Sequence, residues 1–221
     1  MTSDMGGTSW DVGIINNGTI EIKREADFAG RRFNLPMISI ESFFAGTGVY
    51  VNVARQSKRI ELGPDSAGAD VGICFRSPKI TVADCDLVLG DINPDYFLGG
   101  EMKVNAEKAR AAVRQRIAAP LAMSEIEASA GVFRIINQNM ADAAKVVSVQ
   151  RGHDPREYAL VSAGGACSIH ACPIASEVGC RTVIVPKAAS VFCALGMLES
   201  DIRLDHVRTF HALIPGADLG R

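Results

Sequence analysis

The stretch Asp4-Met5-Gly6-Gly7-Thr8-Ser9-Trp10-Asp11 sets two glycines between an aspartate and a pair of hydroxyl residues. Glycine has no Cβ, so the backbone can turn tightly here and bring its N–H groups close to a ligand. Concave arrays of N–H groups suit phosphate oxygens. Thr8 and Ser9 add hydroxyl donors, and Asp4 and Asp11 flank the turn, where they can hold a hydrated divalent cation. The alternative is a plain Gly-Gly turn with an aspartate cap, since short motifs often match by chance.

A second Gly-Gly turn lies far downstream. Residues 158–163, Tyr-Ala-Leu-Val-Ser-Ala, read as a buried strand that runs into Gly164-Gly165-Ala166 and then into a helix starting near Ser168. A strand, a glycine turn and a helix start form a common nucleotide-contact geometry. Two such turns match the layout of the actin and sugar-kinase ATPase superfamily, in which one loop holds phosphate and the other passes beside adenosine.

Further segments carry a resemblance to one family. The chain resembles the hydantoinase A, 5-oxoprolinase and acetone/acetophenone carboxylase family of ATP-dependent enzymes. The matching segments follow the family order from residue 4 to about residue 205: Asp4–Ser9, Leu62–Ala69, Thr81–Asp84, Leu87–Gly90, Phe97–Gly100, Arg151–Arg156, Gly164–Ala166 with His170-Ala171, and Ala194–Gly196.

The resemblance implies an α/β fold of the actin-like ATPase (ribonuclease H-like) type and an enzyme that phosphorylates a carbonyl-derived oxygen with ATP. Phosphoryl transfer needs mainly positioning and charge neutralisation. The family implies phosphate-binding residues at Asp4, Gly6, Gly7, Thr8 and Ser9, and adenosine contacts at Gly164, Gly165 and Ala166. It implies Mg²⁺, or Mn²⁺, organised by Asp4 and Asp11 through water. It assigns no catalytic base.

The branch of the family decides the expected reaction. Carboxylases activate a ketone and bicarbonate for carbon–carbon bond formation, whereas N-methylhydantoinases and 5-oxoprolinases open a cyclic amide. Gly46-Thr47-Gly48 looks closer to the acetophenone carboxylase branch, and residues 71–75 lack the prolines and later glycines of the P-G-P-x-C-Y-G-like segment of the hydantoinase branch. We therefore favour the carboxylase branch, with a cyclic amide hydrolase as the alternative.

Family members carry a large upstream segment with a first phosphate loop, and Met1-Thr2-Ser3 offers little of the strand that normally precedes such a loop. We expect residues 1–210 to be the second ATP-binding half of a larger subunit, with a frayed tail over 211–221. The expected partners are a missing N-terminal half or another subunit of a hetero-oligomer, and a small carbonyl substrate. The isolated chain is then expected to be almost inactive.

Two functions of other classes stay open. A non-catalytic domain that binds nucleotide or a partner without turnover is favoured by Trp10, where the family often has a small residue, and by Phe43-Phe44. A sugar-kinase-like phosphotransferase is disfavoured by the stretch Gly63-Pro64-Asp65-Ser66-Ala67-Gly68, which is specific to the family.

Composition excludes other classes. The chain has 221 residues, 48% of them hydrophobic and 22% charged, with a net charge of −2. It has no basic stripe for nucleic acid and no apolar run long enough for a membrane span. The six cysteines include no C-x-x-C pair, which favours buried free thiols in a reducing cytoplasm, with a reactive thiol at Cys167 as the alternative.

Local patterns predict the remaining elements. Asn16-Asn17-Gly18 predicts a hairpin between strands over 12–15 and 19–23. Further strands are expected over 35–40 and 49–53, with a hairpin corner at 43–48 as the simplest reading, and 62–70 reads as a loop.

Helix signals follow. Thr81 and Asp84 suit a helix start, residues 105–119 form a short helix stopped by Pro120, and Ser124 with Glu127 opens a long helix to Val147. Loop His153 is more simply a packing residue than a catalytic one. The strand after the second glycine turn completes a C-terminal βαβ unit, and residues 190–198 form a short helix.

Overall fold

The computed structural model describes residues 1–208 except Ala29, Leu35, Arg55, Ala69, Arg203, Asp205 and Val207. Its centre is a five-stranded sheet in the order β13-β12-β1-β2-β9. The bounds are Thr2–Met5 for β1, Trp10–Gly13 for β2, Ile40–Phe43 for β9, Ala159–Ala163 for β12 and Thr182–Ile184 for β13. β12 runs parallel to β1 and β13, whereas β2 runs antiparallel to β1 and β9. This mixed sheet with its helices confirms the expected α/β class.

The expectation that residues 1–3 supply little of a strand is wrong. β1 is the central strand, and it pairs with β12 on one side and β2 on the other. Ser3 and Met5 are fully buried, and the terminal amino group of Met1 donates a hydrogen bond to the carbonyl of Ala159 (2.9 Å). Pairing on both sides stabilises a strand whose own sequence carries little β-propensity.

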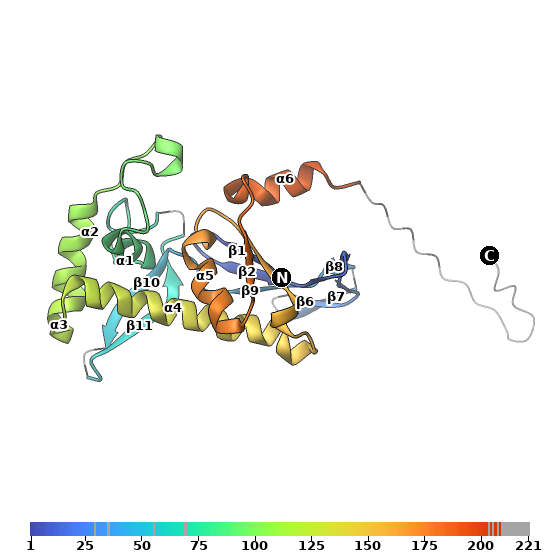
Figure 1. The fold of residues 1–221 in the computed structure, drawn as a ribbon, viewed down its shortest axis with the longest axis horizontal. Helices are drawn as coiled ribbons and strands as arrows, with labels where there is room; N and C mark the ends of the chain where they lie inside the picture. The colour runs from blue at the N-terminus through green and yellow to red at the C-terminus, as the bar shows by residue number, and fades with distance from the viewer. Residues whose placement is uncertain are drawn as a thin grey trace, which may run out of the picture.

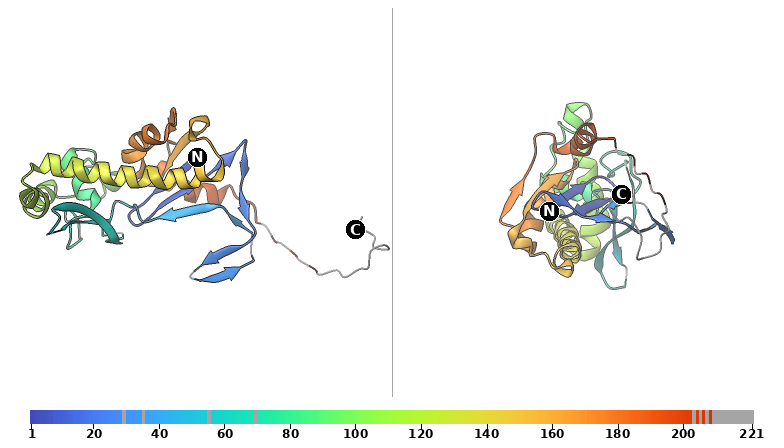
Figure 2. Two further views of the ribbon diagram at one scale, coloured as in Figure 1. Left: turned by 90° about the horizontal axis from the view of Figure 1, so that it is seen from below. Right: turned by 90° about the vertical axis from the view of Figure 1, so that its right-hand side faces the viewer.

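Two helices cover one face of the sheet. α4 (Glu125–Val147) contacts β2 and β9, and α5 (Cys167–Val178) contacts β12 and β1. Figure 2 shows α4 running along most of the molecule's length. The parallel unit β12-α5-β13 confirms the predicted βαβ connection. The Ser124–Glu127 capping box that begins α4 is also confirmed, with Glu127 N–H donating to Ser124 Oγ (3.2 Å).

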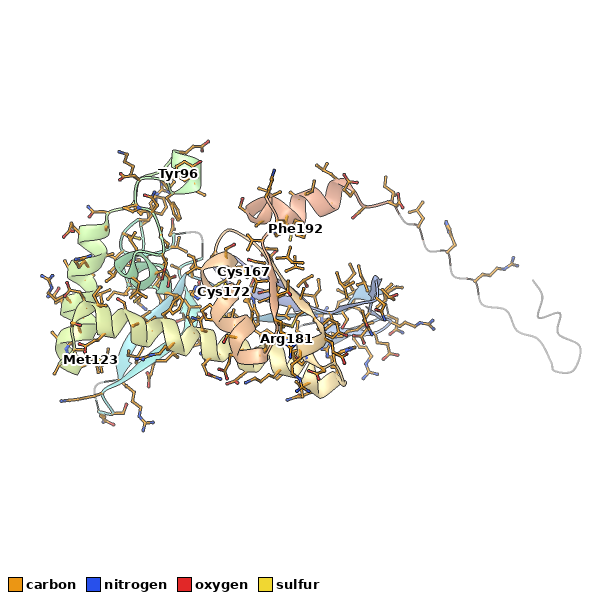
Figure 3. The ribbon with its side chains drawn as sticks, viewed as in Figure 1. Tyr96, Met123, Cys167, Cys172, Arg181 and Phe192 are labelled. Carbon is orange, nitrogen blue, oxygen red and sulfur yellow. The ribbon has the colours of Figure 1, made fainter. Side chains whose placement is uncertain are left out.

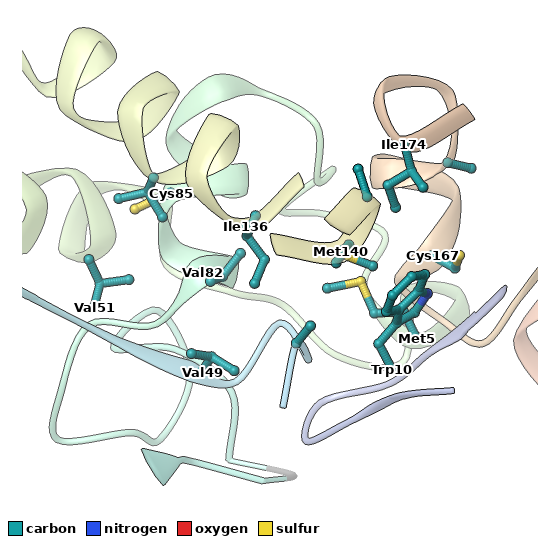
Figure 4. Close-up of a cluster of buried hydrophobic side chains, with 14 of the residues drawn as sticks. Met5, Trp10, Val49, Val51, Val82, Cys85, Ile136, Met140, Cys167 and Ile174 are labelled. Atoms are coloured by element: carbon teal, nitrogen blue, oxygen red, sulfur yellow. The ribbon is translucent and has the colours of Figure 1, made fainter. Parts of the chain in front are cut away.

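Alternation along the strands separates the two faces of the sheet. Met5 and Trp10 turn toward the helices, where they are fully buried and pack with Met140 of α4 and Ile174 of α5. Figure 4 shows this core continuing to Val49, Val51 and Val82 beside α4. Asp4, Asp11 and Ser42 turn to the opposite face, here called the open face.

The other end of α4 packs against a helical lobe. α1 (Val82–Leu89) and α2 (Ala106–Val113) contact α4, and β10 (Val49–Ala54) pairs with β11 (Arg59–Ser66). Thr81 and Asp84 form the predicted capping box at the start of α1. Residues 62–70 were expected to be a loop, which is wrong for the part within β11. Pairing with β10, across a register shift at Val49/Val51, overrides the loop-like composition.

The helix after Asn105 extends further than expected. α2 continues through a π-helical turn, Arg114–Ala118, into α3, Ala119–Leu121, so Pro120 lies inside the last turn rather than stopping the helix. A wider turn accommodates the proline because the ring has no N–H to place in the i→i−4 ladder. The helix then ends at Ala122, which is in the left-handed conformation (φ 55°).

Short ribbons extend from the sheet between β2 and β9. They are β3–β4 (Ile15–Asn16 with Thr19–Ile20), β5–β8 (Ile22–Lys23 with Met37–Ile38) and β6–β7 (Ala26–Phe28 with Arg31–Phe33). Asn17 (φ 49°) and Gly18 (φ 76°) make the predicted hairpin turn, whose type requires positive φ at both residues. Figure 2 shows the β6–β7 ribbon projecting from the body.

The last described elements lie beyond β13. The predicted C-terminal helix is α6 (Phe192–Leu198), and the 3₁₀ segment Ala189–Val191 directly precedes it. Other 3₁₀ segments occur at Leu98–Gly100, Val149–Arg151 and Pro155–Glu157. Figure 1 shows α6 standing apart from the other helices. Most of its side chains are exposed, including Met197 (79%) and Leu198 (83%). In the described residues, no helix combines the length and the hydropathy that a membrane crossing needs.

Candidate functional site

The first turn, Gly6–Ser9, joins β1 to β2 at the end of the central strand. The Gly6 N–H donates to the Ser9 carbonyl (3.1 Å), which closes the turn. Within the described part of the chain, the N–H groups of Gly7, Thr8 and Ser9 donate to no protein acceptor. A short array of unpaired backbone donors therefore lies at this sheet edge, as a phosphate cradle requires.

A supporting loop holds the first turn from behind. Thr47 N–H donates to the Gly6 carbonyl (3.1 Å), and Gly48 N–H donates to the Gly7 carbonyl (2.7 Å). A Cβ on Gly46 would lie 2.4 Å from the Gly7 oxygen, so only glycine permits this approach. Residues 43–48 are thus a packed connection between β9 and β10, not the simple hairpin corner that was expected, because β9 pairs with β2 and β10 with β11.

The second turn, Gly164–Ala166, lies directly beside the first. The carboxyl ends of the parallel strands β1 and β12 lie side by side, with Asp4 opposite Ala163. Ala166 N–H donates to the Met5 carbonyl (3.2 Å). Gly164 has φ 81°, and a Cβ there would lie 2.4 Å from Asp4 Oδ1. The structure therefore brings the two sequence-predicted glycine turns together around Asp4.

Gly6 and Gly165 differ from the adjacent glycines, Gly7 and Gly164, in the space around the position that a Cβ would occupy. A Cβ on either would meet no heavy atom within 4 Å, whereas a Cβ on Gly7 would lie 2.4 Å from the Gly68 oxygen. Gly7 and Gly164 are thus needed for the fold itself. The space at Gly6 and Gly165 is open on the side where a ligand would lie.

The carboxylates of Asp4 and Asp11 form a row on the open face. Asp4 is the cross-strand partner of Asp11, which is opposite Ser42 on β9. Ser42 donates to Asp11 Oδ1, and Cys193 of α6 donates to Asp4 Oδ2 (2.7 Å). The hydrogen bond to Asp4, with burial and the two nearby carboxylates, raises the pKa of Cys193 to about 11.

Asp4 and Asp11 suit a cation that keeps most of its water ligands better than a cation bound entirely by protein side chains. Among the described residues, no group of three or more His, Cys, Asp or Glu side chains can hold a metal ion. Mg²⁺ commonly keeps several waters and takes only one or two carboxylates together with substrate phosphates. Asp4 and Asp11, beside an array of free N–H donors, match that mode. Two surface hollows of about 450 and 480 Å³ lie elsewhere. The first is lined by Pro94 and residues 103–107, and the second by Ile14, Asn16, Asn17, Thr19, Glu21 and His153.

Trp10, Phe43 and His153 do not point into the space beside the two glycine turns. Trp10 is fully buried, and its indole Nε1 donates to Ser3 Oγ (2.7 Å), so it supports the turn from below and does not fill it. Phe43 packs against Trp10 with ring centroids 5.9 Å apart. His153 pairs with the Tyr158 hydroxyl (Nδ1···O 3.0 Å), at the opposite end of β12 from the second turn.

The cysteines divide into buried and exposed thiols. All six are free, and Cys172 and Cys193 are exposed whereas the other four are buried. Cys167 begins α5 (Figure 3), but its side chain is fully buried against Ser3, and burial raises the pKa of the Cys167 thiol. The structure therefore does not support the alternative of a reactive thiol at Cys167.

Sequence reasoning missed the residues that reach the site from a distance. Cys193 contacts Asp4 across 189 positions, and the Ala189 carbonyl accepts from Gly164 N–H (2.8 Å). Ser42 reaches Asp11 through strand register. No local motif marks these contacts, because they depend on where α6 and β9 lie in the fold.

The family model for hydantoinase/oxoprolinase matches residues 1–206. The chain belongs to the hydantoinase/oxoprolinase family. It is 38% identical over 212 residues to the caprolactamase subunit alpha of Pseudomonas jessenii, which covers 95% of this chain and 30% of that protein. It is 35% identical over 216 residues to the acetone carboxylase beta subunit of Xanthobacter autotrophicus, covering 96% and 30%.

Solved structures agree with this assignment. The nucleotide-free structure of acetone carboxylase superposes with a TM-score of 0.82 at 36% identity, covering 88% of this chain and 28% of that one. ATP-dependent caprolactamase from Pseudomonas jessenii superposes with a TM-score of 0.81 at 37% identity, covering 91% and 29%. The chain thus spans about 30% of the length of the relatives that it matches.

Proposed function

We propose that this chain is an ATP-binding half of a family enzyme that activates a carbonyl compound by phosphoryl transfer. The observation that carries the proposal is the meeting of the two glycine turns at one sheet edge, with Asp4 between them. The strand order, with three antiparallel strands followed by two parallel ones, supports an actin-like ATPase architecture.

Each group at this edge has a role in the proposal. The free N–H groups of the first turn, with Thr8 and Ser9, receive the phosphates. The second turn passes beside adenosine, with open space at Gly165. Asp4 and Asp11 hold Mg²⁺ or Mn²⁺ through water, and the cation supplies charge neutralisation on the phosphates when it is bound. The backbone donors cost little to align, because the strands and the supporting loop already fix them.

The carbonyl substrate distinguishes two candidate reactions. We favour carboxylation of a ketone on the strength of Gly46-Thr47-Gly48 and the similarity to the acetone carboxylase beta subunit. The second candidate is ATP-dependent hydrolysis of a cyclic amide, which the similarity to caprolactamase subunit alpha favours.

The rest of such an enzyme is proposed to cover the exposed apolar surfaces. Large apolar side chains are exposed along the ribbons and around α6, and exposed apolar surface of this kind often marks an interaction site. They are Ile15, Ile20, Ile22, Met37, Ile38 and Ile40 on the first surface, and Val191, Leu195, Met197 and Leu198 on the second. A further half of the subunit, or another subunit, is the proposed occupant.

Calorimetric titration with ADP and with ATP, each with and without Mg²⁺, tests the proposal. We expect binding that depends on Mg²⁺. Parallel assays of the full-length subunit with its partners would compare ATP consumption with a ketone plus bicarbonate and with a lactam. A protein that binds neither nucleotide, alone or in the assembled enzyme, would overturn the proposal.

A further inference from the structure

A buried polar cluster joins three helices behind the candidate site. Asp86 of α1, Asn137 of α4 and His170 of α5 are all buried, and Asp86 and His170 are fully so. His170 Nδ1 donates to Asn137 Oδ1 (2.9 Å), and the Phe133 ring stacks on the imidazole with centroids 5.1 Å apart. The orientation of the His170 ring is therefore fixed from two sides.

The remaining imidazole nitrogen faces a carboxylate without completing a hydrogen bond. His170 Nε2 lies 3.6 Å from Asp86 Oδ2, beyond hydrogen-bonding distance. Among the residues that the structure describes, neither oxygen of Asp86 has a hydrogen-bond partner, nor has His170 Nε2 or Asn137 Nδ2. Unsatisfied polar atoms in a protein interior are costly, so a native cluster of them calls for an explanation.

Each of the two helices that carry this pair is linked to one of the two turns. Ala83 N–H, at the start of α1, donates to the Thr47 carbonyl (2.9 Å), and Thr47 in turn holds Gly6 of the first turn. His170 lies on α5, one turn after the second turn ends. A path of contacts therefore runs from the first turn through α1, Asp86, His170 and α5 to the second turn, which bonds back to Met5, and it is interrupted only between Asp86 and His170.

We propose that Asp86 and His170 are positioning residues that set the spacing of the two nucleotide-binding turns. The pair, whose Nε2 and Oδ2 atoms do not yet form a hydrogen bond, is the unfinished link in the path of contacts. Closure of the turns around a nucleotide brings Nε2 and Oδ2 within hydrogen-bonding distance. The resulting charge-assisted bond stabilises the liganded arrangement, and such bonds are about twice as strong as neutral ones. This inference rests on the proposed nucleotide site.

Two measurements on the 221-residue protein test the inference. Nitrogen-15 NMR of its imidazoles, with His170 assigned from a His170→Gln variant, follows the Nε2 environment as ADP·Mg²⁺ is added. We expect the His170 signals to shift and a hydrogen-bonded N–H proton to become visible. Calorimetry should show ADP·Mg²⁺ affinity about fivefold lower in Asp86→Asn, because a neutral hydrogen bond replaces a charge-assisted one.

The matched control is Asp95→Asn, which removes an exposed carboxylate in the segment that follows the same helix. It should leave both the affinity and the His170 signals unchanged. Binding of ADP·Mg²⁺ with unaltered His170 signals, or equal affinity in Asp86→Asn and parent, would overturn the inference alone. Absence of nucleotide binding by the parent protein would overturn the proposed function and the inference with it.

Discussion

Asp86 and His170 lie 3.6 Å apart, Oδ2 to Nε2, and neither side chain has any exposed surface. Burial raises the pKa of Asp86 above its usual 3.8, opposed by His170 and reinforced by Asp91 and Asp84. A carboxylic acid with a raised pKa in the folded state binds its proton more tightly there than in the unfolded chain. The fold is therefore destabilised as pH rises from 3.8 through the raised value, and that penalty persists at neutral pH.

Asp86→Asn should remove that penalty. We expect the variant to be more stable than the parent at pH 7 by about 1 kcal/mol or more, or about 2–4 °C in Tm. The difference should shrink toward zero as pH falls to 3.8, because both proteins then carry a neutral side chain at position 86. Thermal melts across this pH range provide the measurement, with Asp95→Asn as the control. A variant less stable than the parent at pH 7 would show that the charged pair stabilises the fold.

Asp4 allows a test of the metal assignment. Asp4→Ala should weaken Mg²⁺-dependent nucleotide binding while leaving the fold intact, because the side chain is on the open face and its backbone remains paired on both sides. Calorimetry and circular dichroism measure the two effects. Asp95→Ala, which removes an exposed carboxylate near Lys103, is the control. Joint loss of binding and of the folded spectrum would make Asp4 a structural turn residue.

The thiols report on the packing of the chain. Cys172 and Cys193 are exposed and the other four cysteines are buried, so an aromatic disulfide reagent should label only these two thiols in the native protein. Cys193 should react more slowly than Cys172, because its pKa is about 11 beside Asp4. Asp4→Asn should accelerate labelling of Cys193 only. Fast labelling of four or more thiols would contradict the buried positions.

The isolated chain should bind ATP·Mg²⁺ weakly and turn it over barely or not at all. It spans about 30% of the length of the caprolactamase and acetone carboxylase subunits that it matches, and Gly6 and Thr8 of the first turn are exposed. Phosphoryl transfer requires that the reacting groups be positioned and that water be excluded from them. Exposed turns at the ends of the strands exclude little water. A phosphate-release assay on the purified 221-residue protein checks this. Robust ATPase activity would show that the described turns suffice.

Local signals in the sequence predicted the elements that depend on local chemistry. Asn17-Gly18 fixed the hairpin, and Ser124 with Glu127 fixed the start of α4, because both act within a few residues. The two glycine turns were found for the same reason. The two turns meet around Asp4 because β1 pairs in parallel with β12. The predicted βαβ unit covered only the C-terminal strands and did not include this pairing with the first strand.

Local sequence patterns could not predict the contacts between segments that are far apart in the chain. The strand β11 forms because β10 offers it partners, although Gly63 and Pro64 have low β-propensity. The Cys193–Asp4 and Asp86–His170 contacts join residues that no spacing rule relates. The positive φ at the second turn belongs to Gly164 and not to Gly165, a distinction that the Gly-Gly pattern alone does not make.

The neighbouring glycines of the second turn should respond differently to substitution. Gly165→Val places its side chain in open space, so we expect little loss of thermal stability but a clear loss of ATP affinity in protein that includes the rest of the subunit, where the side chain would meet the adenosine. Gly164→Ala is the contrasting variant: its φ of 81° costs about 1–2 kcal/mol, and its Cβ would clash with Asp4 Oδ1 and the Met5 carbonyl, each 2.4 Å away. It should therefore lower Tm. Calorimetry and thermal melts separate the two effects, and equal ATP affinity in Gly165→Val and parent would show that this turn is a packing feature and that adenosine lies elsewhere.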